Sequence, residues 1–254
     1  MGDGKWLATV HTTGPWDATA QHGGPPSALL GRVMQRCEPR DDMIIARFTC
    51  EILSAIPVGE LTVQARLARP GRSVLLLEGV ITAGGREVAL ARAWRVLRAQ
   101  SPSAGPGLPP PPGLPDHGTP PPPGGWVDGY LSAIEWRNVR GQFGERGPAT
   151  VWARMRYPLL PDEEPGPLER VLAIADSSSG VSGELDLREW HFINPELTVH
   201  LHRDAAGEWI CLDAQTTISA GGAGLGTSVL ADLDGPVGVC AQSLHNAPRT
   251  RRPG

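Results

Sequence analysis

The first 98 residues alternate between hydrophobic and polar positions in a way that is typical of strands, with one helical stretch among them. Turn signals at Pro57-Val58-Gly59, Pro70-Gly71 and Gly84-Gly85 divide the alternating segments. The expected strands cover residues 5–10, 44–53, 60–68, 73–81 and 87–97. After the first of them, Gly23-Gly24-Pro25-Pro26 begins a segment with apolar residues at helical spacing, namely Ala28, Leu29, Leu30, Val33 and Met34. The pattern predicts one helix followed by four strands.

Residues 126–247 show the same order of elements. A helix is expected from Gly166-Pro167-Leu168-Glu169, with proline and an acidic residue in its first turn. The expected strands cover residues 132–140, 149–157, 190–202, 208–218, 224–233 and 237–244. One helix and a run of strands, without βαβ alternation, favour an α+β fold. We expect each half to be an antiparallel sheet wrapped around one long helix, with the two sheets joined edge to edge so that two strand edges are covered.

A proline-rich segment separates the two halves. Residues 99–125 contain two runs of four prolines among glycines and small residues, and proline can enter neither a helix interior nor a central strand. We therefore expect an N-terminal domain over 1–98, a linker over 99–125, a C-terminal domain over 126–247 and a basic tail over 248–254. The pattern around Gly84-Gly85 returns about 150 residues later around Asp234-Gly235, which indicates a duplicated domain.

Charge and composition exclude several classes of function. The 254 residues carry a formal net charge of −4, so the chain has no basic footprint for nucleic acid or an anionic membrane. The N-terminus lacks the apolar core of a signal peptide, and no apolar run is long enough to span a membrane. The four cysteines, Cys37, Cys50, Cys211 and Cys240, form no CxxC pair, and we expect reduced thiols in a cytoplasmic protein.

Three stretches resemble one family. They are Gln21-His22-Gly23-Gly24-Pro25-Pro26-Ser27-Ala28-Leu29-Leu30, then Arg170 to Ser177 in the second helix, and Phe192-Ile193-Asn194-Pro195-Glu196 to Trp209. In order and placement they are similar to the type II acyl-CoA thioesterases and their actinobacterial relatives. The resemblance covers nearly the whole chain apart from the linker and the tail. It implies a double hot-dog fold and hydrolysis of acyl-coenzyme A in lipid metabolism, without a cofactor.

The resemblance also implies a catalytic trio. Members of the family use an Asp, a Thr or Ser, and a Gln to hold the attacking water, and these positions fall on Asp176, Asn194 and Gln242. Asn194 departs from the pattern because a carboxamide replaces the hydroxyl. A carboxylate can accept a proton from water, whereas the two amides can only orient it.

The glycines at the start of the first helix suggest how the thioester is held. Free backbone amides and the positive end of the helix dipole stabilise anionic oxygen there, so we expect His22, Gly23 and Gly24 to bind the substrate, with the Gly24 amide near the thioester oxygen. The alignment of the halves pairs Asp176 with Met34 and Gln242 with Arg92, so the first half lacks the trio. We therefore expect one site per chain, shared between the halves.

Other interpretations of these residues stay open at this point. Asp176 also fits a polar helix end, Asn194-Pro195 a turn, and Gln242 an edge strand. His200 and His202 share one strand face but have no third ligand nearby, so we expect no metal site. A non-catalytic acyl-binding protein, a hot-dog dehydratase or hydratase, and a carrier-protein thioester as substrate are the alternatives. Exposed sheet edges favour self-association into a homo-oligomer.

Overall fold

The computed structural model describes residues 4–119, 128–187 and 189–249. The first half contains β1 (Lys5–Leu7), the 3-10 helix η1 (Val10–Thr12), α1 (Gly24–Arg36), β2 (Met43–Ile52), β3 (Glu60–Arg69), β4 (Val74–Ala83) and β5 (Arg86–Leu97). The second half contains α2 (Tyr130–Ala133), β6 (Ile134–Arg140), β7 (Ala149–Met155), α3 (Pro167–Ala175), α4 (Ser178–Val181), β8 (Trp190–Ile193), β9 (Glu196–Leu201), β10 (Ile210–Ile218), β11 (Ala223–Asp232) and β12 (Gly235–Pro248).

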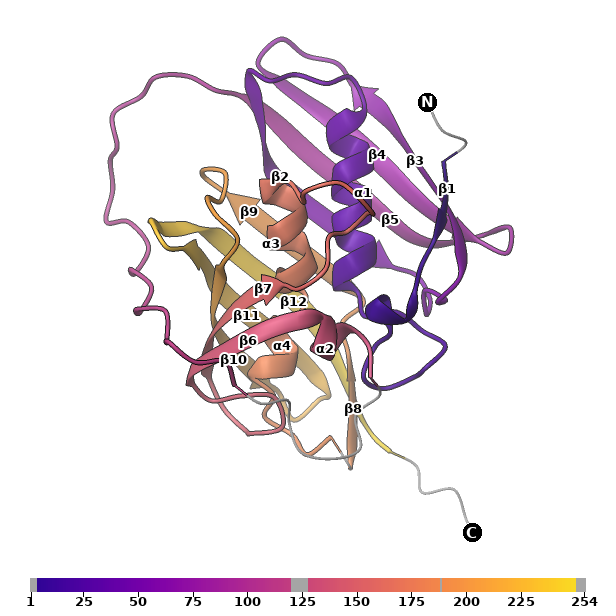
Figure 1. Cartoon of the computed structure of the whole chain (residues 1–254), viewed down its shortest axis with the longest axis vertical. Helices are drawn as coiled ribbons and strands as arrows, with labels where there is room; N and C mark the ends of the chain where they lie inside the picture. The colour runs from indigo at the N-terminus through magenta and orange to yellow at the C-terminus, as the bar shows by residue number, and fades with distance from the viewer. Residues whose placement is uncertain (1–3, 120–127, 188, 250–254) are drawn as a thin grey trace.

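All strands belong to one antiparallel sheet. Its order is β1-β3-β4-β5-β2-β9-β12-β11-β10-β7-β6, with β8 paired to β12 outside this path (Figure 1). The two halves meet where β2 pairs with β9, and Thr49 lies opposite Thr198 in the middle of that seam. Each half thus contributes one continuous part of the sheet, in the same strand order about the seam. This is the double hot-dog fold that the sequence predicted.

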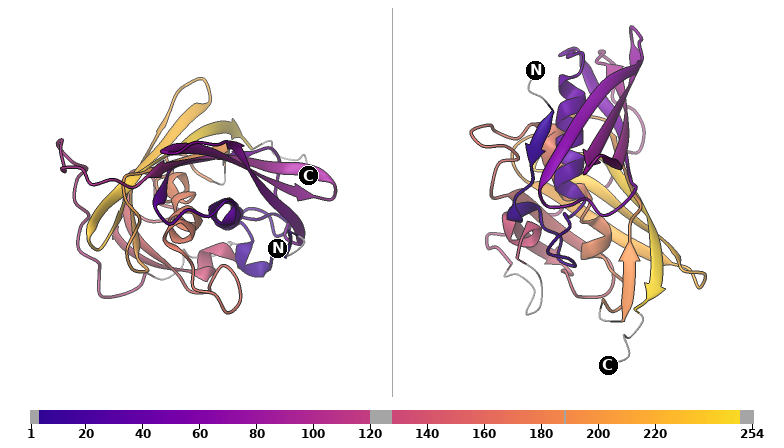
Figure 2. Two further views of the ribbon diagram at one scale, coloured as in Figure 1. Left: turned by 90° about the horizontal axis from the view of Figure 1, so that it is seen from above. Right: turned by 90° about the vertical axis from the view of Figure 1, so that its right-hand side faces the viewer.

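The helices occupy the concave face of the sheet. Seen from above, the sheet curves over α1 and α3, which lie against each other (Figure 2). The apolar residues of α1 and α3 are buried in one core that extends through both halves, including Leu30, Met34, Leu172 and Ile174. Burial of such side chains contributes about 1.5–3 kcal/mol each. The packing of α1 against α3 therefore joins the two halves in addition to the pairing of β2 with β9.

Two buried arginines secure α1. Arg95 of β5 is 3% exposed and donates to the carbonyl oxygens of Met34, Gln35, Cys37 and Glu38, in the last turn of the helix and just after it. A cation at this end also complements the helix dipole, and it takes the place of the usual glycine cap.

Arg32, in the middle of α1, forms a buried ion pair with Glu169 of α3, at 2.8 Å between Nη1 and Oε1. It also contacts Glu163. Since Arg32 and Glu169 are each 4% exposed, this pair crosses the core between the two halves.

The second half departs from the expected elements at the start of residues 132–140, where the short helix α2 takes up the first two positions of the predicted strand, and at two breaks further along. The single long helix expected from residue 166 is divided into α3 and α4, because the chain turns at Asp176 and Ser177. The strand expected over 190–202 is likewise divided into β8 and β9, and Asn194-Pro195 stands in the break. Both breaks place a predicted site residue outside regular structure, where its side chain is directed by local turns instead of by a helix or a ladder.

The linker follows the outside of the second half as far as the structure describes it. Leu114 packs on a cluster of Trp152, Trp209, Cys211 and Ala231 that lies apart from the main core. The Thr119 amide donates to the carbonyl oxygen of Trp136 at 2.7 Å. Residues 120–125 of the predicted linker, 126–127 of the predicted C-terminal domain and 250–254 of the predicted tail lie outside the described residues. Before them, β12 extends to Pro248 and the Arg249 amide donates to Glu189 at 2.7 Å.

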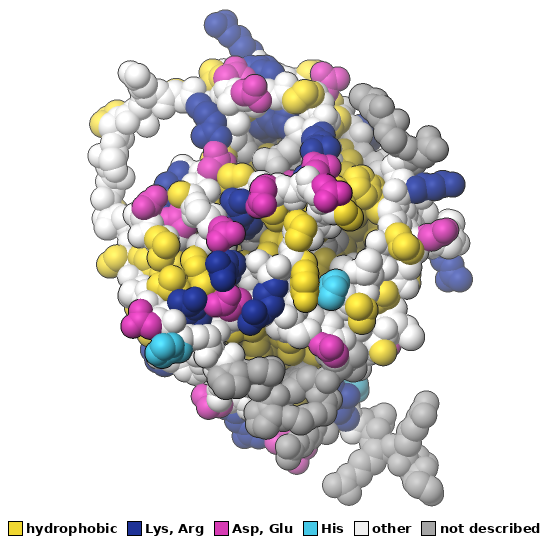
Figure 3. All heavy atoms as spheres, viewed as in Figure 1, with side chains coloured by type: hydrophobic (Ala, Val, Ile, Leu, Met, Phe, Trp, Pro, Cys, Tyr) yellow, Lys and Arg dark blue, Asp and Glu magenta, His cyan; other side chains and the backbone are white. Residues whose placement is uncertain are grey.

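The described surface carries both signs of charge. On the face shown in Figure 3, Lys and Arg side chains alternate with Asp and Glu, and no single-sign field dominates that face. None of the helices in the described ranges combines the length and the apolar character that a bilayer crossing requires.

Candidate active site

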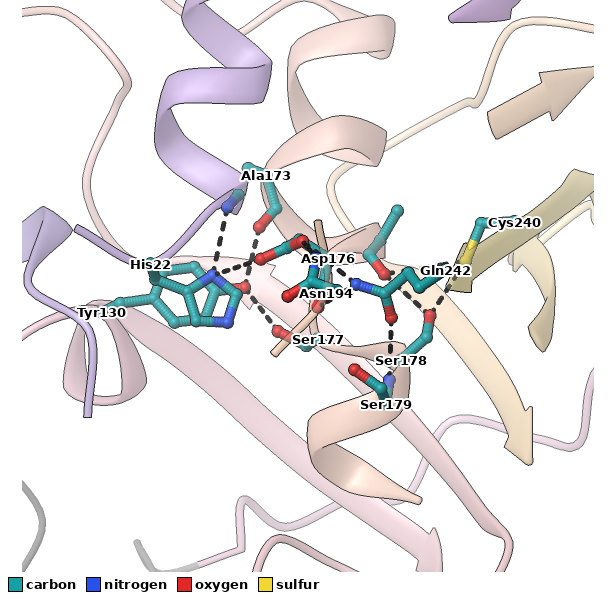
Figure 4. Close-up of polar contacts among 12 residues, drawn as sticks. His22, Tyr130, Ala173, Asp176, Ser177, Ser178, Ser179, Asn194, Cys240 and Gln242 are labelled. Atoms are coloured by element: carbon teal, nitrogen blue, oxygen red, sulfur yellow. Dashed lines mark hydrogen bonds and ion pairs between the residues drawn. The ribbon is translucent and has the colours of Figure 1, made fainter. Parts of the chain in front are cut away.

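Asp176 lies at the junction between the two halves. It is the residue after the last turn of α3, has helical φ and ψ of −63° and −15°, and is 5% exposed. The preceding helix is apolar and fills the core, so the carboxylate is carried into the interior by the packing of its neighbours. Figure 4 shows that His22 from the first half and Asn194 and Gln242 from the second all point at it.

The two predicted amides bind the same carboxylate oxygen. Asn194 Nδ2 donates to Asp176 Oδ1 at 2.7 Å, and Gln242 Nε2 donates to it at 3.1 Å. Gln242 is fully buried; its Nε2 also donates to the Asp176 carbonyl at 3.0 Å, and its Oε1 accepts from the Ser179 amide at 3.0 Å. Gln242 therefore fixes the turn between α3 and α4, and the structure brings the predicted trio together.

His22 faces the other carboxylate oxygen. Its Nδ1 lies 3.2 Å from Asp176 Oδ2, and the Gly24 amide donates to the same Nδ1 at 3.1 Å. The imidazole is stacked on Tyr130, with ring centroids 3.8 Å apart and an interplanar angle of 8°. Burial lowers the pKa of His22, and the nearby Asp176 only partly offsets this effect. The ring is thus held neutral and in a fixed orientation beside the carboxylate.

The two glycines are required by contacts within the protein. A Cβ on Gly23 would lie 2.7 Å from Asp176 Oδ2, and a Cβ on Gly24 would lie 2.2 Å from the carbonyl oxygen of Ala173 in α3. The sequence pointed to close approach of a ligand; the structure shows close approach of α3 and its carboxylate at these positions.

The amides at the start of α1 are also fewer than the sequence suggested. Pro25 and Pro26 have no N–H, the Ser27 amide donates to the Gly23 carbonyl at 3.1 Å, and the Gly24 amide donates to His22. Within the described residues, the Gly23 amide has no hydrogen-bond acceptor. Gly23 and Gly24 are the donors that could serve an anionic oxygen here.

Tyr130, whose ring is stacked on the imidazole of His22, was not predicted from the sequence. Its Oη donates to the Ala173 carbonyl at 2.7 Å and lies 2.8 Å from Ser177 Oγ. Burial raises the pKa of Tyr130, so the phenol stays protonated and can donate. No local motif marks this tyrosine, because it follows the proline-rich segment directly and reaches the site only through tertiary packing.

The serine run after Asp176 forms a buried hydroxyl network. Ser178 Oγ donates to the Ala175 carbonyl at 2.7 Å and lies 2.9 Å from Ser228 Oγ and 3.0 Å from Cys240 Sγ. These polar groups are small and satisfy one another, so they stabilise the turn after α3. The run Ser177-Ser178-Ser179 is recognisable in the sequence, but its buried partners in β11 and β12 could not be predicted from it.

The strand register explains why the first half has no matching site. Thr49 pairs with Arg92, and its counterpart Thr198 pairs with Ala241. Gln242 therefore corresponds to Ala93, and the predicted pairing with Arg92 is wrong by one residue, which reverses the face of the sheet. Ala93 is buried and apolar, so the first half offers no amide there.

A large cavity lies elsewhere in the first half. It has a volume of about 1590 Å³ and is lined by residues of α1 and β1 to β5, among them Trp6, Arg36, Cys37 and Arg92. None of the six predicted site residues lines it. Among the described residues, no three His, Cys, Asp or Glu side chains are grouped as metal ligands.

Two family models match successive parts of the chain. The family model described as the acyl-CoA thioesterase N-terminal domain matches residues 12–96, and the one described as the acyl-CoA thioesterase C-terminal domain matches residues 111–245. A search of the curated proteins finds no match.

Solved structures resemble the chain over almost its whole length. A conserved protein of unknown function with a hot dog fold from Alicyclobacillus acidocaldarius has a TM-score of 0.72 at 15% identity, covering 98% of this chain and 93% of the other. The tesB protein of Mycobacterium avium subs paratuberculosis has a TM-score of 0.70 at 14% identity, with coverage of 96% and 92%. The acyl-CoA thioesterase II TesB2 of Mycobacterium marinum has a TM-score of 0.63 at 16% identity, with coverage of 89% and 90%. At these identities the structures support the fold, and the two family models, which together span most of the sequence, show that the chain belongs to the acyl-CoA thioesterase family.

Proposed function

We propose that the chain hydrolyses acyl-coenzyme A thioesters to the free acid and coenzyme A, with Asp176 as the base that takes a proton from water. One observation carries the proposal: a nearly buried carboxylate is held by two side-chain amides on one oxygen, and an imidazole nitrogen lies 3.2 Å from the other. A carboxylate that is fixed in this way needs little reorganisation when it accepts a proton.

The roles of the three side chains follow from their contacts. Asp176 Oδ1 is occupied by Asn194 and Gln242, so Oδ2 is the oxygen available for the proton of the attacking water. Asn194 has an Oδ1 that accepts no hydrogen bond from the described residues, and this atom can orient the same water. Gln242 has both amide hydrogens committed to Asp176, and we assign it to positioning the carboxylate.

The start of α1 supplies the donors for the oxyanion. The Gly23 amide and, once His22 Nδ1 no longer accepts from it, the Gly24 amide face the region next to Asp176. Each donor of this kind contributes about 10²–10³ in kcat in other hydrolases. Collapse of the tetrahedral intermediate then breaks the C–S bond and releases the thiol.

Coenzyme A is proposed as the carrier of the acyl group because both family models and one similar structure, that of Mycobacterium marinum, are named for acyl-CoA.

A thiol-release assay on a panel of acyl-CoA substrates tests the proposal. Asp176→Asn keeps the shape and can still accept from both amides, and we expect kcat/KM to fall about 10²–10⁴-fold. Asp41→Asn, on an exposed turn before β2, is the matched control and should retain wild-type turnover. Turnover of Asp176→Asn near the wild-type value would remove this carboxylate from the reaction. Saturable binding of acyl-CoA to the wild-type protein without thiol release would replace hydrolysis by non-catalytic binding.

A further inference from the structure

His22 Nδ1 has two neighbours that it cannot satisfy at once. The Gly24 N–H lies 3.1 Å away and needs a lone pair, whereas Asp176 Oδ2 lies 3.2 Å away and needs a proton between the two atoms. An imidazole nitrogen carries either one lone pair or one hydrogen in the ring plane. The position of a single proton therefore decides which of the two neighbours is hydrogen-bonded to His22.

The surroundings restrict where that proton can be. Oδ1 of Asp176 already accepts from Asn194 and Gln242, so a proton taken up by the carboxylate goes to Oδ2, directly beside Nδ1. The stack on Tyr130 holds the ring in this orientation, and the phenol is itself anchored to the Ala173 carbonyl. The other ring nitrogen, Nε2, has no hydrogen-bond partner among the described residues.

We propose that His22 is a proton relay that receives, through Nδ1, the proton that Asp176 removes from water. This inference rests on the proposed function and extends it, because the imidazole takes part in the proton transfer in addition to lining the substrate site.

The relay balances as follows for a ring that starts with its proton on Nε2. The water oxygen forms a bond to the thioester carbon, and one water proton passes to Asp176 Oδ2 and on to His22 Nδ1. The C–S bond breaks, the sulfur leaves with the bonding electron pair, and the imidazolium gives it the Nε2 proton. Proton exchange with solvent then returns the ring to its starting tautomer, and nothing is consumed except water and the thioester.

The relay also links proton transfer to oxyanion binding. When Nδ1 takes up the proton it no longer accepts from the Gly24 amide, which becomes free as negative charge develops on the carbonyl oxygen. The donor is thus occupied in the resting protein and released in the transition state, where it is needed.

Two amide substitutions separate a relay from a residue that only positions Asp176. His22→Asn places an amide near the position of Nδ1, where it can donate to Asp176 or accept from Gly24, whereas His22→Gln places one near Nε2. A relay needs both nitrogens in one ring, so we expect each variant to lose about 10²-fold in kcat, within the range of acid–base catalysis, with KM changed less than threefold. His200→Asn, on the exposed side of β9, is the matched control and should leave kcat unchanged.

The outcomes are decisive in either direction. If His22→Asn keeps wild-type kcat, His22 only positions the carboxylate and the relay is refuted. Loss of kcat in both variants, with thermal unfolding unchanged, supports it. The ¹⁵N shifts of His22 give a readout independent of turnover: they should change in Asp176→Asn if the proton is shared, and unchanged shifts would overturn the relay. Absence of thiol release from the wild-type protein would count against the proposed function, and the shifts would still test the shared proton.

Discussion

Gly24→Ala tests whether the close approach of α1 and α3 holds the site together. The new Cβ would lie 2.2 Å from the Ala173 carbonyl oxygen, below the 3.0 Å that such contacts essentially always exceed. Because the obstacle is backbone, relief requires the helices to move apart. Overpacking of this kind costs about 1–3 kcal/mol, and the lower chain entropy of alanine offsets only about 0.4–1 kcal/mol of it.

The same displacement should reach the carboxylate. Ala173 precedes Asp176 by three residues in the chain, so a helix shift of about 1 Å moves the carboxylate relative to the first half and can lower kcat about 10²-fold. Urea unfolding followed by tryptophan fluorescence measures the stability, and thiol release measures the turnover.

Gly31→Ala is the matched control on the same helix. Its Cβ would meet Leu172 Cδ1 at 2.5 Å and Leu168 Cδ2 at 3.2 Å, and both are ends of side chains that can rotate. We expect a change of less than about 1 kcal/mol, since alanine gains about 0.5–1 kcal/mol over glycine in a helix interior. Equal stability and equal kcat of the two variants would refute the argument from backbone contact.

Three further predictions concern stability and are checked by denaturant unfolding. Arg95→Ala should cost about 3–5 kcal/mol because four carbonyl groups at the end of α1 lose a charged donor, and Arg95→Lys should recover only part of it. Burial raises the pKa of Asp232, but hydrogen bonds from Arg203 and from two backbone amides lower it by more, so the net pKa is below the ordinary value. Its folded pKa lies below the unfolded value, so its stabilisation is complete above about pH 4 and is lost as the pH falls through the folded pKa; Asp232→Asn should flatten this acid dependence. Glu169→Gln should cost about 1–3 kcal/mol, because Arg32 loses a buried charged partner but keeps its contact with Glu163, whereas Arg32→Met with Glu169→Leu should be close to neutral.

The fold was predictable because its signals are local. Alternating positions, glycine and proline turns and the apolar face of residues 28–34 are patterns within a few residues of the chain, and they predicted most of the strands and the starts of α1 and α3. The missed breaks have a different origin. Asp176 ends α3 because Gln242, 66 positions further on, binds its backbone carbonyl and its carboxylate. No local propensity contains that information.

Only the site residues that lie in recognisable stretches of the sequence were predictable. Asp176, Asn194 and Gln242, which the resemblance indicated, lie together, and His22, predicted separately from the start of the first helix, lies beside them. Their partners could not be predicted in the same way. The pairing of Gln242 with Arg92 failed by one residue, since a low-similarity alignment does not fix strand register and only the ladder through the seam does.

The seam between β2 and β9 has a consequence for how the chain folds. Thr49 and Thr198 are about 150 positions apart, so their pairing closes one of the longest loops in the molecule. Contacts within each half join residues that are much closer in the sequence, and the shorter loops between them close sooner during folding. Asp176 and His22 come from opposite sides of this seam. Each half can therefore form its own part of the sheet before the two residues are brought together in one site.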